Sequence, residues 1–442
     1  MLDINRLLKD HDFAELIKQS GISFVIRIFG QILGLLLTFI IARYFGADSL
    51  GDYVLAIVIL RIFTLFSKLG TDIFSIRFIA SFAKQGKWVS IQRFRNKILF
   101  IVIFSSIFFS CLMYFSSSHI ANLIQANNEH IRLGAFFILP MALFMLHYQS
   151  LRGLKRIAEF SFFYRMSQAF FSIIFIFIIS KFLKETSVPF YAYLLSLFVV
   201  SVLALFSFIY HFKKCSVHNE SEKIEALSLT YILRISLPLM FAQLVQFLMA
   251  FTDKLMLGNM MTTHDVGVYF TAFKLSMIAS VGLMSINSIA APKFAELYGH
   301  KDLDGLKNIS YQSSKVIFWI TIPLILCFFS FPEFILGIFG EDFKLGVSAL
   351  IFLSVGKLIS SLCGSVGNLL QMTGNQLIFM KCLLCGAIIN IILNLLLIPS
   401  YGINGAAISS MFSLSSWNIL MVYFVKRELG FNMFYLPLLR KL

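Results

Sequence analysis

Two stretches of this chain, residues 37–53 (LTFIIARYFGADSLGDY) and 253–269 (DKLMLGNMMTTHDVGVY), decide how it folds. In each stretch an apolar segment runs up to a glycine, a short turn follows, and a Gly-x-Tyr sequence opens the next apolar segment. The Gly-x-Tyr glycines, Gly51 and Gly267, are 216 residues apart, and the glycines before the two turns are 212 residues apart. This nearly constant offset predicts that the chain consists of two similar halves.

Apolar runs long enough to cross a bilayer, which takes about 20 residues, extend outward from these stretches through the whole chain. Reading them against the polar breaks predicts about twelve membrane-spanning helices, at 21–42, 51–69, 97–115, 132–151, 160–182, 188–211, 234–256, 266–290, 314–331, 346–371, 376–398 and 403–425. The second run is the weakest, because Arg61 interrupts it.

The composition favours a membrane protein. Of the 442 residues 58% are hydrophobic and only 13% are charged, whereas roughly a quarter are charged in a soluble protein. Because charges cover the surface of a soluble fold, their scarcity indicates a surface that faces lipid. The net charge of +15 would suggest a nucleic-acid partner in a soluble protein, but basic residues here mark the cytoplasmic loops. We therefore predict no nucleic-acid partner.

The distribution of Lys and Arg predicts the orientation. Twenty-seven of these residues fall in the segments on one side of the membrane, six on the other side and four within helices. This bias places both termini in the cytoplasm. An odd number of helices would destroy the pattern, so the bias also supports the count of twelve.

A third match extends the repeat, because residues 151–153 (LRG) and 372–374 (MTG) are 221 positions apart. Each half holds an even number of helices, so both halves begin on the same side of the membrane. The repeat is therefore parallel, with its axis along the membrane normal, and transporters of this kind bind substrate between their halves. The predicted organisation is an N-terminal lobe (1–212), a cytoplasmic linker (213–230) and a C-terminal lobe (231–442).

Several sequence signatures resemble those of the bacterial polysaccharide flippases, in the multidrug/oligosaccharidyl-lipid/polysaccharide exporter superfamily. They cover nearly the whole chain in the same order. The N-terminal signature comprises LTFIIARYFG at 37–46, LGDY at 50–53, LG at 69–70 and RFIA at 77–80; the second lobe opens with DKLMLG at 253–258 and VGVY at 266–269; the C-terminal signature comprises NIILNLLLIP at 390–399 and YGINGAA at 401–407.

This resemblance implies an all-α membrane protein with two six-helix lobes in a V shape like that of the MATE transporters, working by alternating access. It implies a transporter of undecaprenyl-diphosphate-linked oligosaccharide, such as an O-antigen repeat unit of lipopolysaccharide. The substrate would move from the cytoplasmic to the periplasmic leaflet of the bacterial inner membrane. Membrane lipids and other polysaccharide assembly proteins are the further partners that the resemblance implies.

We single out four basic residues that sit inside apolar segments: Arg27, Arg61, Lys274 and Lys357. Each costs about 2.5–3.5 kcal/mol at the middle of a bilayer, so we expect them to face water or a partner rather than lipid. Arg61 and Lys274 follow their Gly-x-Tyr glycines by ten and seven residues, so each lobe presents a cation at similar depth. A cleft with such walls suits a diphosphate, which Arg binds bidentately. Snorkelling to the interface and pairing with acids are the alternatives.

Asp253 is the best candidate for binding a coupling ion, H⁺ or Na⁺, and a structural pair with Lys254 is the alternative. Ion coupling would suit a second function, a drug/cation antiporter of the same superfamily. A membrane glycosyltransferase or polymerase is a third, although such enzymes need a sizeable loop or a carboxylate and metal constellation. The chain has no phosphate-binding Walker sequence, and we expect no cofactor. His147 and Gln243 are expected as interior polar groups, with sugar binding as the alternative.

Overall fold

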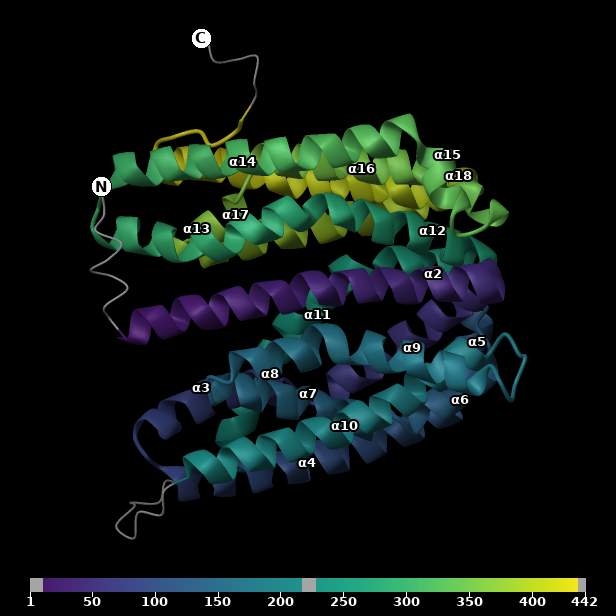
Figure 1. Ribbon diagram of the computed structural model, residues 1–442, viewed down its shortest axis with the longest axis horizontal. Helices are drawn as coiled ribbons and strands as arrows, with labels where there is room; N and C mark the ends of the chain where they lie inside the picture. The colour runs from purple at the N-terminus through teal and green to yellow at the C-terminus, as the bar shows by residue number, and fades with distance from the viewer. Residues whose placement is uncertain (1–10, 217–227, 436–442) are drawn as a thin grey trace. The chain divides into compact units, whose positions relative to one another are not determined.

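The computed structural model describes residues 11–216 and 228–435, and within these ranges every regular element is a helix (Figure 1). The chain forms two compact units. Unit 1 comprises the residues up to Ile41 together with Asp52–Gln246, and unit 2 comprises Ala42–Gly51 and the residues from Phe247 onward. The all-α fold class is confirmed. The predicted linker, 213–230, lies mostly outside the described residues, and the lobe boundaries stay predictions.

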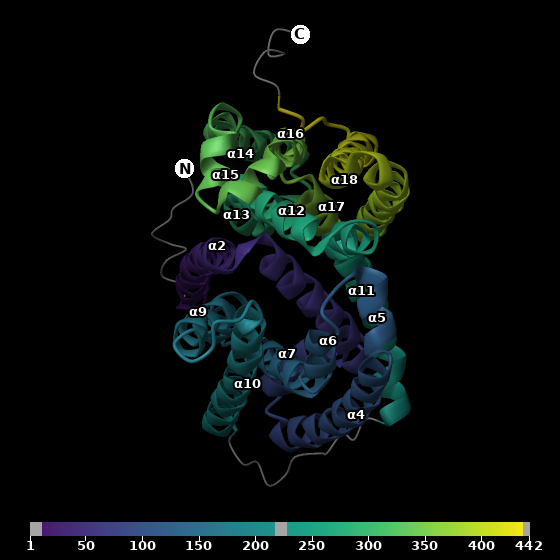
Figure 2. The same cartoon turned by 90° about the vertical axis from the view of Figure 1, so that its right-hand side faces the viewer.

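Unit 1 is built around helix α7, which packs against α3, α4 and α10, while α10 also packs against α9 (Figure 2). Its aromatic core includes Phe78, whose ring stacks on that of Phe94 with centroids 3.8 Å apart. The helices of unit 1 are α2 (His11–Ser67, except for the part in unit 2), α3 (Thr71–Lys84), α4 (Trp88–Phe115), α5 (Ser117–Ile124), α6 (Asn128–Ala135), α7 (Ile138–Gly153), α8 (Ile157–Ser161), the π-helical turn η1 (Phe162–Ser167), α9 (Gln168–Ile179), α10 (Val188–Cys215) and the first part of α11 (Leu229–Met260).

Unit 2 is a bundle in which α16 packs against α14 and α18, and both views show these three helices as neighbours (Figures 1 and 2). Its core gathers Phe294, Leu306, Leu369 and Met421 from four different helices. Its helices are the rest of α11, α12 (Thr263–Ser276), the 3₁₀ turn η2 (Met277–Ser280), α13 (Val281–Gly299), α14 (Leu303–Ser330), α15 (Pro332–Gly337), the 3₁₀ turn η3 (Glu341–Gly346), α16 (Val347–Cys363), α17 (Val366–Met372) and α18 (Gln376–Leu429).

The described residues contain nine helices long and apolar enough to cross a membrane, or ten when the bent pair α6 and α7 counts as one span. Two of the nine, α2 and α18, are far longer than a bilayer needs. Each contains a glycine with non-helical backbone, Gly46 (φ 83°) in α2 and Gly402 (φ 51°) in α18. These breaks lie where adjacent predicted spans meet, so each long helix holds two spans and the count agrees with the predicted twelve.

Three helices differ from the sequence expectation. The predicted span 346–371 ends early at Cys363, because Gly364 adopts a left-handed φ of 66° that starts a new helix, α17. The predicted span 160–182 begins with the π-helical turn η1. Helix α3 follows a break at Leu69 and Gly70, both with positive φ. Its 14 residues are too few to cross a bilayer as a separate span.

An exposed apolar stripe on α4 supports the membrane assignment. Phe100, Phe104 and Phe108 are spaced four residues apart and are 66%, 72% and 60% exposed. Residues at this spacing share one face of a helix. A large exposed aromatic surface is costly in water and favourable in lipid, so this face is suited to the hydrocarbon core.

Candidate functional site

In unit 1, Arg61 lies on α2 among buried tyrosines. It is hydrogen-bonded to Tyr193 and lies within electrostatic range of Tyr53 and Tyr148. The rings of Tyr53 and Tyr193 meet edge to face, with centroids 5.8 Å apart. Inside unit 1 the guanidinium group of Arg61 therefore lies among the hydroxyl groups of these tyrosines.

A second basic group of unit 1 forms where α2 meets the π-helical turn. Gly30 allows the close approach, because a Cβ there would come within 2.6 Å of the backbone oxygen of Arg165. Arg27, one turn before Gly30, consequently lies within electrostatic range of Arg165 and of Arg152 near the end of α7. Like charges repel one another, so an arrangement of three guanidinium groups favours a bound polyanion.

Asp253 is the centre of a polar network in unit 2. Its side chain is buried, and both carboxylate oxygens accept hydrogen bonds from neutral groups. The side-chain amides of Asn390 and Asn394 each donate to Oδ1 at 2.9 Å. The hydroxyl of Tyr269 donates to Oδ2 at 2.7 Å, and that of Ser410 donates to the same oxygen. Four neutral groups therefore donate hydrogen bonds to this carboxyl group, two to each oxygen.

Three lysines of unit 2 lie near this network. Lys254 is 1% exposed, its Nζ donates to the carbonyl oxygen of Ala250 at 2.6 Å, and it lies 3.6 Å from the ring centroid of Phe273. It is within electrostatic range of Asp253, Lys274 and Lys357. The structure therefore brings together three of the residues singled out in the C-terminal half, Asp253, Lys274 and Lys357.

The sequence did not indicate several residues that lie next to these side chains in the structure. The sequence indicated Lys254 only as a possible partner of Asp253, but α11 continues to Met260 and the Lys254 side chain is buried. Asn390 and Asn394 are four residues apart on one helix, a spacing that puts two amides on the same face. That spacing is the one signal that could have indicated a buried polar partner for Asp253.

In unit 1, Lys68 is an example of a buried cation with a structural role, because it is paired with a carboxylate and a side-chain amide. Lys68 Nζ contacts Asp72 Oδ2 and Gln243 Oε1, each at 2.6 Å, and Gln243 donates to Asp72 Oδ1 at 3.2 Å. The two charges of this network, on Lys68 and Asp72, therefore pair with each other beside the break between α2 and α3. The expectation that Gln243 is a satisfied interior polar group is confirmed.

The chain matches the family described as "Polysaccharide biosynthesis protein" over residues 16–298, which is more than half of its length. The chain belongs to this family. Residues 238–396 also match the MatE family. The resemblance noted in the sequence is thus confirmed at the level of the family.

Known relatives and solved structures agree with this polysaccharide biosynthesis family. A "Probable low-salt glycan biosynthesis flippase Agl15" of Haloferax volcanii is 25% identical over 174 residues, which are 39% of this chain and 37% of that protein. An inward-facing multidrug resistance MATE transporter aligns with a TM-score of 0.73 and 15% identity over 92% of this chain and 98% of its own. The lipid II flippase MurJ aligns with a TM-score of 0.71 and 17% identity, over 91% and 87%.

These likenesses show that this family member shares the fold of the MATE transporter and MurJ structures. The chain spans little more than a third of the length of the curated relative it matches. Its own substrate and partners are therefore matters for a proposal.

Proposed function

We propose that the protein is a flippase for undecaprenyl-diphosphate-linked oligosaccharide, such as an O-antigen or related polysaccharide repeat unit. It carries the lipid-linked glycan from the cytoplasmic to the periplasmic leaflet of a bacterial inner membrane by alternating access, with both chain termini in the cytoplasm. It works with the membrane lipids and with other proteins of polysaccharide assembly. Membership of the polysaccharide biosynthesis family supports this proposal.

The observation that carries the proposal is the excess of positive charge in the membrane-spanning helices. Arg27 has two other arginines within electrostatic range, and Lys254 has two other lysines and a single carboxylate. Such groups attract a ligand with several negative charges, and a diphosphate meets this requirement. The tyrosines around Arg61 offer flat apolar faces and hydroxyls, which suit the sugar units that follow the diphosphate.

Asp253 supplies the coupling-ion site of the proposed cycle. Its two oxygens accept hydrogen bonds from neutral donors, so the carboxyl group can take up a proton or Na⁺ without an ammonium group in direct contact. Lys254 Nζ donates to the carbonyl oxygen of Ala250 rather than to this carboxyl group. Binding of a cation would lower the negative potential at this site, and release would restore it.

A drug/cation antiporter is the second candidate, and the MatE match over residues 238–396 favours it. A cationic drug needs an accessible carboxylate, and Asp253 is the carboxylate on which this function would depend. The cations around Lys254 repel such a drug, so we place the anionic substrate first. A membrane glycosyltransferase or polymerase is the least favoured candidate, because the fold is that of transporters.

Deletion of the gene in its natural host separates these candidates. The flippase proposal predicts that lipid-linked repeat units collect in the inner leaflet and that surface glycan is lost, with both restored by the wild-type gene. Unchanged surface glycan together with altered sensitivity to cationic drugs would replace it with the antiporter. Polymerising activity of the purified protein on the same repeat units would replace it with an enzyme.

A further inference from the structure

One end of unit 1 carries exposed cations on the helix faces that carry exposed aromatic rings further along. On α4, Arg93 lies seven residues before Phe100, and both side chains are exposed. On α10, Lys213 and Lys214 follow Phe206 by seven and eight residues, and all three are exposed. Residues at these spacings share one face of a helix. On each helix the cations therefore continue the exposed aromatic face.

The beginning of α4 and the end of α10 lie side by side (Figure 1). The rings of Trp88 and Phe212 meet edge to face, with centroids 5.8 Å apart. Further along both helices, the guanidinium carbon of Arg95 lies 5.8 Å from the ring centroid of Phe208. The two helices thus run in opposite directions here, and their cations gather at the same end of unit 1.

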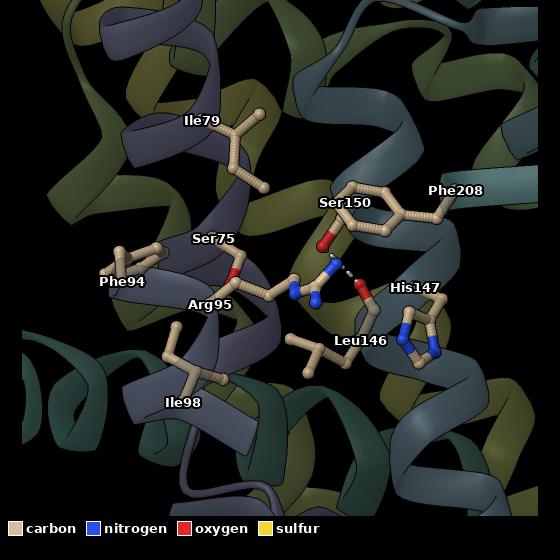
Figure 3. Close-up of a pocket in the computed structure, with 9 residues that line it drawn as sticks. All are labelled: Ser75, Ile79, Phe94, Arg95, Ile98, Leu146, His147, Ser150 and Phe208. Atoms are coloured by element: carbon tan, nitrogen blue, oxygen red, sulfur yellow. Dashed lines mark hydrogen bonds between the residues drawn. The ribbon is translucent and has the colours of Figure 1, made fainter. Parts of the chain in front are cut away.

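The neighbouring cation Arg95 points the other way, into the interior of unit 1. Together with Ser75, His147 and Ser150 it lines a small pocket among the helices (Figure 3). Arg93 precedes it by two residues, which is just over half a turn of an α-helix, and is exposed. Arg93 therefore faces outward, on the side where lipid surrounds the aromatic stripe of α4.

The charge at this end of unit 1 is mostly positive. Neither α4 nor α10 contains an acidic residue. Glu159 of α8 lies close to the end of α10, but its Oε1 is paired with His211 Nε2 at 3.1 Å. Lys214 and Arg156 lie within electrostatic range of the same imidazole ring. Cations gathered in this way repel one another and attract an anion from their surroundings.

The position of these cations along the helices corresponds to the surface of the membrane. Arg93 lies about 10 Å beyond Phe100, and Lys213 about 10 Å beyond Phe206, at 1.5 Å per residue. Trp88 is a residue type that prefers the level of the lipid head groups, and long basic side chains extend toward that level. The anions present there are the phosphate groups of lipids.

We propose that this face of α4 and α10 binds an anionic phospholipid such as phosphatidylglycerol. Arg93, Lys213 and Lys214 hold the charged head group, and the acyl chains lie along Phe100 and Phe206. Each cation close to an anionic lipid strengthens binding by about fivefold. The inference does not depend on which substrate the protein carries.

Lipid binding by the purified full-length protein tests this site. The protein in detergent is titrated with phosphatidylglycerol or phosphatidylcholine of the same acyl chains, and bound lipids are counted by native mass spectrometry. We expect the wild type to bind phosphatidylglycerol at least about tenfold more tightly. The triple variant Arg93→Gln/Lys213→Gln/Lys214→Gln should lose this preference. Lys181→Gln/Lys184→Gln, at exposed cations in the turn before α10, is the matched control and should keep it.

Equal binding of the two lipids by the wild type would overturn the proposal, and so would a preference that persists in the triple variant. Displacement of the phosphatidylglycerol by excess inorganic phosphate would also overturn it, because the site would then take a free anion. Cross-linking of the wild type with a phosphatidylglycerol that carries a photoreactive head group gives a readout that does not depend on a variant folding. Cross-links within residues 88–97 and 206–214 would support the site, and their absence there would overturn it.

Discussion

A carboxylate inside a membrane helix is costly unless its charge is stabilised, and Asp253 shows how this chain meets that cost. Four donors, from α12 and from the two halves of α18, converge on its two oxygens. Its partners Asn390 and Ser410 lie more than 130 residues away along the chain. The sequence shows that Asp253 is an acidic residue within an apolar segment. Its hydrogen-bond partners could not be predicted, because tertiary packing brings them together and hydrophobic periodicity carries no information on such distant contacts.

Replacing this carboxylate by its neutral isostere tests its role. In Asp253→Asn the side chain no longer attracts a cation, and its amide meets the amides of two asparagines that now lack an acceptor. We expect export to fall about tenfold or more, since a hydrogen bond to a charged group contributes about 1.5–3 kcal/mol, and we expect its dependence on an ion gradient to vanish. Export is measured as surface glycan per cell. Asp304→Asn, at an exposed site on α14, is the control. Full export with an unchanged gradient dependence would contradict the role.

Lys357 gives a second test at this scale. Lys357→Met keeps the length of the side chain and removes its charge, so the cost of about 2.5–3.5 kcal/mol for a lysine in the bilayer disappears. We expect membrane insertion and thermal stability to be maintained or improved while export falls by about tenfold, a loss of ~1.4 kcal/mol of transition-state stabilisation. Lys315→Met, exposed on α14, should leave both properties unchanged. Normal export in Lys357→Met would remove this lysine from the substrate site.

At the scale of helices, composition and periodicity predicted the spans, whereas single residues decided where they break. The turns at Gly46 and Gly402 coincide with predicted ends, because a polar turn and a glycine interrupt the apolar run there. The break at Gly364 was missed, because the serines and glycines around it, at 360–367, carry no charge and leave the apolar run continuous. The π-helical turn η1 was missed for the same reason, since its extra residue leaves no mark on hydrophobicity.

The glycines that open the two Gly-x-Tyr sequences, Gly51 and Gly267, lie against backbone of the opposite stretch within unit 2. A Cβ on Gly51 would come within 1.8 Å of the carbonyl oxygen of Thr263, and one on Gly267 within 2.1 Å of that of Ala47. Glycine is needed at both positions because the backbones touch. The sequence singled out these two glycines because they recur at equivalent positions in both halves. The structure shows why a residue without a side chain is needed at each position.

Gly51→Ala should therefore destabilise the fold. The backbone of Thr263 has to move to admit the methyl group, and overpacking of this kind costs about 1–3 kcal/mol. We expect a lower midpoint of thermal unfolding in detergent and a lower yield of folded protein. Gly299→Ala, where a Cβ would meet nothing within 4 Å, should match the wild type. A midpoint of Gly51→Ala equal to that of the wild type would show that the two turns do not need this close approach.

For the molecule as a whole, the low charge content and the internal repeat predicted an all-helical membrane protein, and the structure and the family match confirm that class. The grouping of the basic residues within each unit could not be predicted, because it depends on packing between helices distant in sequence. Only the structure shows that Arg165 lies near Arg27, and that Lys254 lies near Lys274 and Lys357. The positive charge of the spans nevertheless pointed toward an anionic substrate from the beginning.

The most direct test of that conclusion is transbilayer movement of the substrate in proteoliposomes that contain only the purified protein. A fluorescent undecaprenyl diphosphate bearing a short oligosaccharide is placed in both leaflets, and a membrane-impermeant reductant destroys the fluorescence it can reach. The account predicts that nearly all fluorescence is lost with the wild type, but only the outer-leaflet half with empty liposomes and with a variant in which Arg27, Arg61 and Lys357 are replaced by Met. Retention of half of the fluorescence with the folded wild type, under an imposed H⁺ or Na⁺ gradient of either direction, would contradict it.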